Sequence, residues 1–173
     1  MAKTKKYYRR KYNKGRWSAN IDNIIEDIVF QAGTSGYSLV TLQRNPVQSS
    51  SSVSQQYTVK NIELTYEFEV SDPQSLSAIE NLQAYIMYVP QAMTIDETLP
   101  FTHPEYIMAY RWLGSPNLDT TQPGRSPLYI KTRLSRRLQT GDKIIFLIIG
   151  KNTSASQIIS SIRGLVRYWT KAN

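Results

Sequence analysis

The sequence contains no cysteine and a single histidine, His103, among its 173 residues. The absence of cysteine excludes disulfides, thiolate metal sites and cysteine nucleophiles. With one histidine, a histidine-based catalytic triad depends on His103 alone, and zinc sites of the usual ligand set are excluded. A glycine-rich phosphate loop and a nucleophile elbow are also missing. We therefore do not expect an enzyme, and we expect no metal and no cofactor.

Long hydrophobic runs are missing as well. The longest, at residues 144–149, is far too short to span a bilayer. The positive charges at the N-terminus are followed by no apolar segment and no small-residue cleavage site, so we expect no secretory signal and no membrane partner. Hydrophobic residues make up 40% of the chain, which is enough for the core of one folded domain.

Acidic residues are absent from residues 1–17, which carry eight of the 21 basic residues. The 13 basic residues that follow equal the 13 acidic residues in number, so this segment holds the whole net charge of +8. It shows no apolar periodicity and contains Gly15, which is typical of a tail without structure of its own. We expect a basic N-terminal arm over residues 1–20 and a folded domain over residues 21–173.

The arm carries the strongest functional signal. Lysines and arginines that neutralise phosphates release condensed counterions, which gives strong, sequence-independent binding to nucleic acid. Aromatic rings between them stack on single-stranded bases, at roughly 1–3 kcal/mol per base. The same composition fits a nuclear import receptor, and the two uses are compatible. The predicted contacts in the arm are Lys3, Lys5, Lys6, Tyr7, Tyr8, Arg9, Arg10, Lys11, Tyr12, Lys14, Arg16 and Trp17.

A second basic cluster comprises Lys131, Arg133, Arg136, Arg137 and Lys143, of which the first four are further candidate contacts. On a strand, Lys131 and Arg133 project from one face, with residues 130 and 134 on the other. Two interpretations remain open. The cluster extends the nucleic-acid surface of the arm, or it is a solvated face that pairs with acids such as those at 67 and 69.

Alternating apolar and polar residues predict β-strands. The clearest example is residues 57–70, where apolar side chains at 62, 64, 66, 68 and 70 alternate with polar ones. A helix is predicted to begin near Thr102, where Glu105 completes a capping box and Pro104 lies in the first turn. Residues 106–112 continue it or form an edge strand. Further strands are predicted at 26–32, 37–43, 82–89, 128–138, 143–150 and 158–169, the last with Gly164 as a bulge.

Seven or eight strands and one short helix favour a β-sandwich or jelly roll over a parallel α/β fold. Twelve tyrosines and three tryptophans exceed what one core of this size needs. Because these residues are favoured where proteins meet, the surplus indicates self-assembly.

One segment carries a resemblance to a known family. Residues 132–144 read TRLSRRLQTGDKI. This resembles a segment of capsid proteins from small circular single-stranded DNA (circovirus-like, Rep-encoding) viruses, in which arginine or lysine and leucine precede a GD turn and an apolar strand. The basic, tyrosine-containing N-terminus and the long alternating strand agree with that layout. The arm is shorter and less rich in arginine than in that family, and the body is small. These departures leave open a satellite-like RNA virus capsid.

The resemblance implies an all-β fold, a single eight-stranded jelly roll of two packed antiparallel sheets with one short helix and a basic N-terminal arm. It implies many copies in an icosahedral shell around single-stranded DNA, or RNA, with the arm facing inward. Loops at 49–54 and 115–127 would lie outside or at symmetry axes. The protein would be found in the virion and, during infection, in the host nucleus.

Two alternatives come from other classes of protein. A cellular nucleic-acid-binding β-barrel module, of ribosomal or chromatin type, predicts basic and aromatic residues over one face of the barrel, whereas here the body is neutral. An enzyme acting on nucleic acid predicts clustered carboxylates for metal-assisted chemistry, and the sequence shows no such cluster.

Overall fold

The computed structural model describes residues 16–45, 56–70, 78–114 and 127–172. Their strands form two four-stranded antiparallel sheets. The first has the order β1 (Ser18–Phe30), β8 (Ile158–Ala172), β3 (Tyr57–Val70) and β6 (Leu128–Leu138). The second has the order β2 (Ser35–Arg44), β7 (Lys143–Asn152), β4 (Ile79–Val89) and β5 (Ile107–Gly114).

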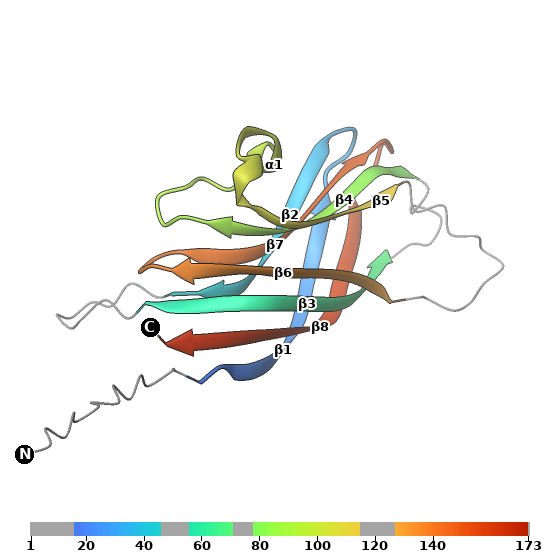
Figure 1. Cartoon of the computed structure of the whole chain (residues 1–173). Helices are drawn as coiled ribbons and strands as arrows, with labels where there is room; N and C mark the ends of the chain where they lie inside the picture. Colours follow the sequence, from blue (N-terminus) through green and yellow to red (C-terminus); the bar gives the residue numbers. More distant parts are fainter. Residues whose placement is uncertain (1–15, 46–55, 71–77, 115–126, 173) are drawn as a thin grey trace, which may run out of the picture.

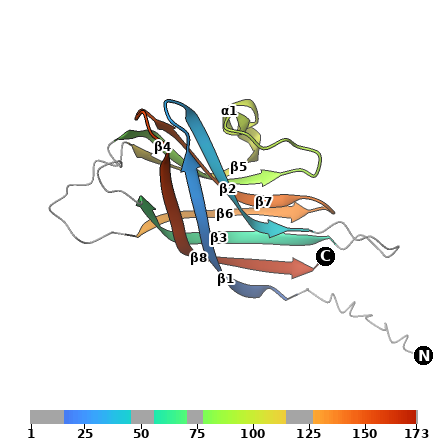
Figure 2. The ribbon, with the colours of Figure 1, turned by 180° about the vertical axis from the view of Figure 1, so that it is seen from behind.

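The strand order is that of a jelly roll (Figure 1). Along the chain, β2 lies between β1 and β3, β4 and β5 lie between β3 and β6, and β7 lies between β6 and β8. The two sheets are therefore wound together rather than built one after the other. The predicted all-β, eight-stranded jelly roll is therefore confirmed. The view from behind shows the two sheets facing one another, with β1 and β2 crossing along one side (Figure 2).

The inner faces of the sheets form the main hydrophobic core. Tyr66 from β3 packs edge-on against Phe146 from β7, with ring centroids 4.9 Å apart. The alternation predicted for residues 57–70 is observed at Ile62, Leu64 and Tyr66, which are buried while Thr65 is exposed. Apolar side chains on one side of each pleated strand thus fill the space between the sheets.

A second apolar cluster covers the outer face of the second sheet. The β4–β5 connection contains the helix α1 (Leu99–Thr102) and the 3₁₀ turn η2 (Pro104–Tyr106). Leu99 packs there with Ile145, Leu147 and Met87. This explains why β7 is apolar on both faces, since one face meets the core and the other meets this connection.

Two local predictions need correction, and one open alternative is decided. The helix does not begin at Thr102: α1 ends there, the Thr102 hydroxyl donates back to the carbonyl of Thr98, and no side-chain capping bond is formed. Of the two continuations left open, the edge strand is observed, as β5. Gly164 is not a bulge, because the registers of β8 with β1 and β3 run unbroken through it.

Irregular pairing occurs elsewhere, between β3 and β6. The register shifts between Lys60 and Ile62, where Asn61 adopts a positive φ of 50°. Across from this shift, Leu134 is 52% exposed, so it does not share the buried side of β6 with Ile130 as predicted. At this shift two β6 residues, Arg133 and Leu134, lie opposite Asn61 alone, so the extra residue of the bulge is on β6 and interrupts its alternation there.

Candidate nucleic-acid interface

The predicted arm lies mostly outside the described residues. This applies to Lys3, Lys5, Lys6, Tyr7, Tyr8, Arg9, Arg10, Lys11, Tyr12 and Lys14. Arg16 and Trp17 are described; both are exposed and directly precede β1. Strand β1 begins at Ser18, within the range predicted as arm, and Ser18 pairs with Thr170 near the end of β8. The root of the arm and the end of β8 therefore lie at the same end of the first sheet (Figure 1).

Trp17 is fixed to the outer face of this sheet. The ammonium of Lys60, on β3, lies 3.9 Å from the centroid of the Trp17 ring. A cation at this distance over an indole ring is a favourable cation–π contact. Trp17 must cross β8 to reach β3, because β8 lies between β1 and β3. The contact thus directs the root of the arm over the outer face rather than along the sheet edge.

Basic residues surround this contact. Lys171, Trp169 and Arg167 lie on the outward side of β8, opposite to its buried Val166 and Tyr168. The register sets Trp169 directly across from Lys60, and sets Lys171 across from Thr58, which in turn faces Arg137 of β6. We call this surface the arm-end patch: Arg16, Trp17, Lys60, Arg137, Arg167, Trp169 and Lys171.

The middle of the same face has balanced charge. Glu63 of β3 is flanked by Lys131 on β6 and Arg167 on β8. Glu67 lies directly across from Arg163. Opposite charges on neighbouring strands attract across the ladder. Of the two interpretations of the β6 cluster, pairing with acids thus fits the register of Lys131, whereas Arg137 belongs to the arm-end patch.

Arg136 faces a different part of the molecule. Its guanidinium donates a 2.9 Å hydrogen bond to the carbonyl of Glu105 in η2 and lies 5.5 Å from the ring centroid of Tyr88. Its Nε is buried and has no hydrogen-bond partner among the described residues. Arg133 is exposed on β6 beside the register shift. Lys143 lies at the start of β7 in the second sheet, whereas the other four residues of the predicted cluster lie on β6 in the first.

Groups for other chemistry are sparse in the part of the chain that the structure describes. No group of three or more histidine, aspartate or glutamate residues there could hold a metal ion. His103 lies at the surface, with Nδ1 3.0 Å from Oε1 of Glu105 and its ring stacked on Tyr106. No helix among the described residues is long and apolar enough to cross a membrane.

Comparison with known proteins finds similar solved structures but no family. No family model matches the sequence, and no curated protein matches it. Among solved structures, a 60-mer of the BFDV capsid protein is similar at 7% identity and a TM-score of 0.44, over 94% of this chain and 96% of that one. Turnip yellow mosaic virus is similar at 13% identity and a TM-score of 0.40, over 90% and 94%.

A third similar structure is that of infectious bursal disease virus, Gx strain, at 14% identity and a TM-score of 0.37, over 93% of this chain and 33% of that one. All three are structures of viruses or viral capsid proteins. Similarity at this level carries no weight for function, so the jelly-roll assignment rests on the strand order of this chain.

Sequence reasoning missed much of the arm-end patch. Lys60, Arg167, Trp169 and Lys171 lie on strands whose composition gave no reason to single them out, and only strand pairing brings them together. One signal was available: β8 carries Arg163, Arg167 and Lys171 and no acidic residue. A strand with three cations and no anion marks a basic face once its neighbours are known.

Proposed function

We propose that this chain is a viral capsid protein that assembles in many copies into a small icosahedral shell and packages single-stranded nucleic acid. One observation supports this most directly: a jelly-roll body of balanced charge is joined to an arm that holds the whole net charge of +8. A protein that binds nucleic acid with its folded body needs no such division. A shell subunit needs a body that packs against its copies and a separate cationic segment for the genome.

The nucleic acid would contact the arm first and the arm-end patch second. The arm supplies basic residues and tyrosines in sequence, and Trp17 joins it to Lys60, Arg167 and Lys171 on the folded body. Indole rings among cations suit single strands, whose bases have exposed faces for stacking. Single-stranded DNA is the proposed cargo, with RNA as the alternative. The virion is the proposed location, with passage through the host nucleus aided by the basic arm.

The test compares the full chain with two variants after purification at moderate salt. One lacks residues 1–15, which preserves Trp17 and β1; the other carries glutamine at every lysine and arginine from 3 to 14. We expect the full chain to form uniform particles by negative-stain microscopy, with a 260-to-280 nm absorbance ratio typical of nucleoprotein. Both variants should lose the nucleic-acid absorbance. A monomer whose oligonucleotide affinity is unchanged in both variants would instead support the cellular binding module.

A further inference from the structure

Charge is divided between the two opposite edges of the first sheet. Strand β1, at one edge, carries Asp22, Glu26 and Asp27 and no basic residue. Strand β6, at the other edge, carries four basic residues and no acidic residue. The two edges of one sheet therefore present opposite charge to the outside.

Strand β5 belongs to the basic edge. Arg111 of β5 donates a 2.5 Å hydrogen bond to the carbonyl of Tyr129 on β6, which joins the edges of the two sheets. Strand β5 likewise has no acidic residue. Its Tyr110 and Trp112 are 52% and 64% exposed, unusual values for large aromatic side chains. The β5–β6 edge surface consists of Tyr110, Arg111, Trp112, Tyr129, Lys131 and Arg133.

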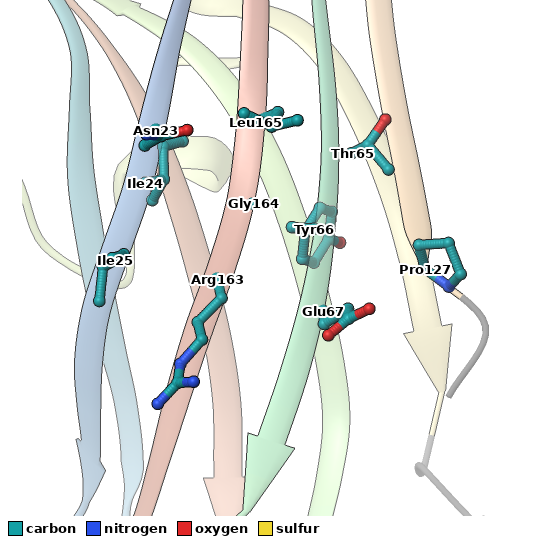
Figure 3. A pocket seen from close by; sticks show the side chains of 10 residues that line it. All are labelled: Asn23, Ile24, Ile25, Thr65, Tyr66, Glu67, Pro127, Arg163, Gly164 and Leu165. Atoms are coloured by element: carbon teal, nitrogen blue, oxygen red, sulfur yellow. The ribbon is translucent and has the colours of Figure 1, made fainter. Parts of the chain in front are cut away.

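The acidic edge is aliphatic. Ile21, Ile25 and Val29 point outward from β1 and are 61%, 73% and 41% exposed. Beside them, a groove of about 470 Å³ opens on the outer face of the sheet. Ile25, Gly164 and Leu165 are among the residues that line it (Figure 3). The β1 edge surface consists of Ile21, Asp22, Ile25, Glu26, Asp27 and Val29.

We propose that the β1 edge surface of one copy docks head to tail on the β5–β6 edge surface of a second copy. Apolar and charge features both match: aliphatic side chains and a groove meet exposed aromatic rings, and three acids meet cations. Tyrosine and tryptophan at the centre of a contact supply much of its binding energy. Opposite charges suppress the wrong pairings, β1 edge on β1 edge above all.

Because the two surfaces lie on opposite sides of the molecule, the contact is heterologous. Each added copy leaves one unused surface of each kind, so the association continues until a ring or shell closes. The contact is made by side chains, because Asp22 and Glu26 lie on the same side of β1 as buried Ile24, and inward charges discourage strand addition at an edge. The inference rests on the proposed self-assembly. It assigns Lys131 and Arg133 to a contact with the β1 edge surface of a second copy.

The absence of cysteine makes a thiol cross-linking test specific. Three single variants are prepared in the full chain: Ile25→Cys, Trp112→Cys and, as the control, Phe101→Cys, whose side chain is 65% exposed outside both surfaces. Pairs are mixed under assembly conditions and treated with a short bis-maleimide. We expect covalent dimers from Ile25→Cys with Trp112→Cys in roughly tenfold excess over either variant alone or either with the control. Equal yields in all mixtures would overturn the proposal.

Charge reversal supplies a second readout. Glu26→Lys with Asp27→Lys is expected to raise the protein concentration needed for assembly roughly tenfold, as is Lys131→Glu with Arg133→Glu. Combining all four substitutions in one chain should restore assembly, because the charges across the contact are again opposite. If the two pairs of residues acted independently, the combined variant would assemble less well than either double variant. Thermal unfolding of each variant is measured first, so that a misfolded variant is recognised. If a charge-reversal variant does not fold, the cross-linking experiment alone tests the proposal.

The two proposals fail in distinguishable ways. Particles that form normally but give no preferred cross-link contradict the head-to-tail contact and leave the capsid function standing. A chain that stays monomeric by sedimentation at every concentration tested contradicts both.

Discussion

The hydroxyl of Tyr88, on β4, donates a 2.7 Å hydrogen bond to the carboxylate of Asp142, in the turn between β6 and β7. The same carboxylate accepts bonds from the backbone amides of Gln139 at 2.8 Å and Gln91 at 3.3 Å. Asp142 is 5% exposed. The aspartate of the GD turn therefore connects the two sheets at one end of the sandwich.

Replacing Asp142 with alanine should destabilise the fold by about 3 kcal/mol, because partly buried donors on three residues lose their acceptor. Tyr88→Phe removes only one of these bonds and should cost about 1 kcal/mol. Urea unfolding of the unassembled protein, followed by fluorescence, measures both. If the alanine variant were no less stable than the phenylalanine variant, the backbone bonds to Asp142 would contribute nothing.

Tyrosine burial makes the protein sensitive to alkali. Burial first, and then the bond to Asp142, raises the pKa of Tyr88 to about 12. Burial likewise raises the pKa of Tyr85 to about 12, and those of Tyr66 and Tyr168 are raised too. In the unfolded chain these groups ionise near pH 10, so the unfolded state loses protons first and is stabilised relative to the folded state.

Stability is therefore expected to be constant with respect to these groups below pH 10 and to fall as pH rises from about 10 to 12. Thermal unfolding at a series of pH values tests this. The Tyr88→Phe variant should show a shallower decline than the wild type. A parallel decline in both would mean that Tyr88 does not contribute.

One tyrosine hydroxyl in the core lacks a hydrogen-bond partner in the part of the chain that the structure describes. The Oη of Tyr66 is buried and has no hydrogen-bond partner among the described residues. Tyr66→Phe should therefore leave stability within about 0.5 kcal/mol of the wild type, or raise it. Tyr168→Phe is the matched control: its hydroxyl donates a 2.6 Å bond to Asp22, and its loss should cost about 1 kcal/mol. Chemical denaturation distinguishes the two, and a larger loss for Tyr66→Phe would contradict the assignment.

The sequence predicted the strands well where one face of each strand is apolar. The period of two in β3 and the apolar run in β7 are local properties, and both strands appear as predicted. The helix near Thr102 was misplaced, because capping chemistry marks several possible starts, and packing of Leu99 on the second sheet decides among them. The beginning of β1 was missed because its residues 18–25 are mostly exposed and pair with β8 through the backbone.

The arm-end patch could not be predicted from the sequence alone. Lys60 and Trp169 are 109 positions apart, and their proximity depends on the register of β3 with β8. The charge of the arm, in contrast, is a property of consecutive residues and was visible at once. The arm-end patch could not be predicted without knowledge of long-range strand pairing, whereas the charge of the arm does not depend on that pairing.

Gly164 offers a test of close approach between strands. A Cβ added there would lie 2.4 Å from the carbonyl oxygen of Thr65 and 2.9 Å from the Cα of Tyr66. Because these are backbone atoms, β3 and β8 would have to separate, and Gly164→Ala should cost about 2 kcal/mol. Gly36→Ala is the control, since its nearest neighbour, a Phe30 ring carbon, is 3.6 Å away. Equal unfolding free energies for the two variants would show that the sheet yields without cost.

Salt dependence tests the arm-end patch separately from the arm. Affinity for a single-stranded oligonucleotide is measured by fluorescence anisotropy over a range of salt concentrations, using the unassembled protein with its arm intact. Each phosphate contact removed should reduce the slope of log affinity against log salt by about 0.7. Arg167→Gln and Lys171→Gln should each show this reduction, whereas Lys151→Gln, an exposed lysine on β7 of the second sheet, should not.

Trp17→Ala should weaken binding without changing that slope, because it removes a stacking surface and not a charge. It also frees Lys60 from the 3.9 Å contact with the ring, so the Lys60 charge remains available to phosphate. If the slope were unchanged in Arg167→Gln and Lys171→Gln, nucleic acid would contact the arm alone. The cations at this end of β8 would then have to act within the protein or between its copies.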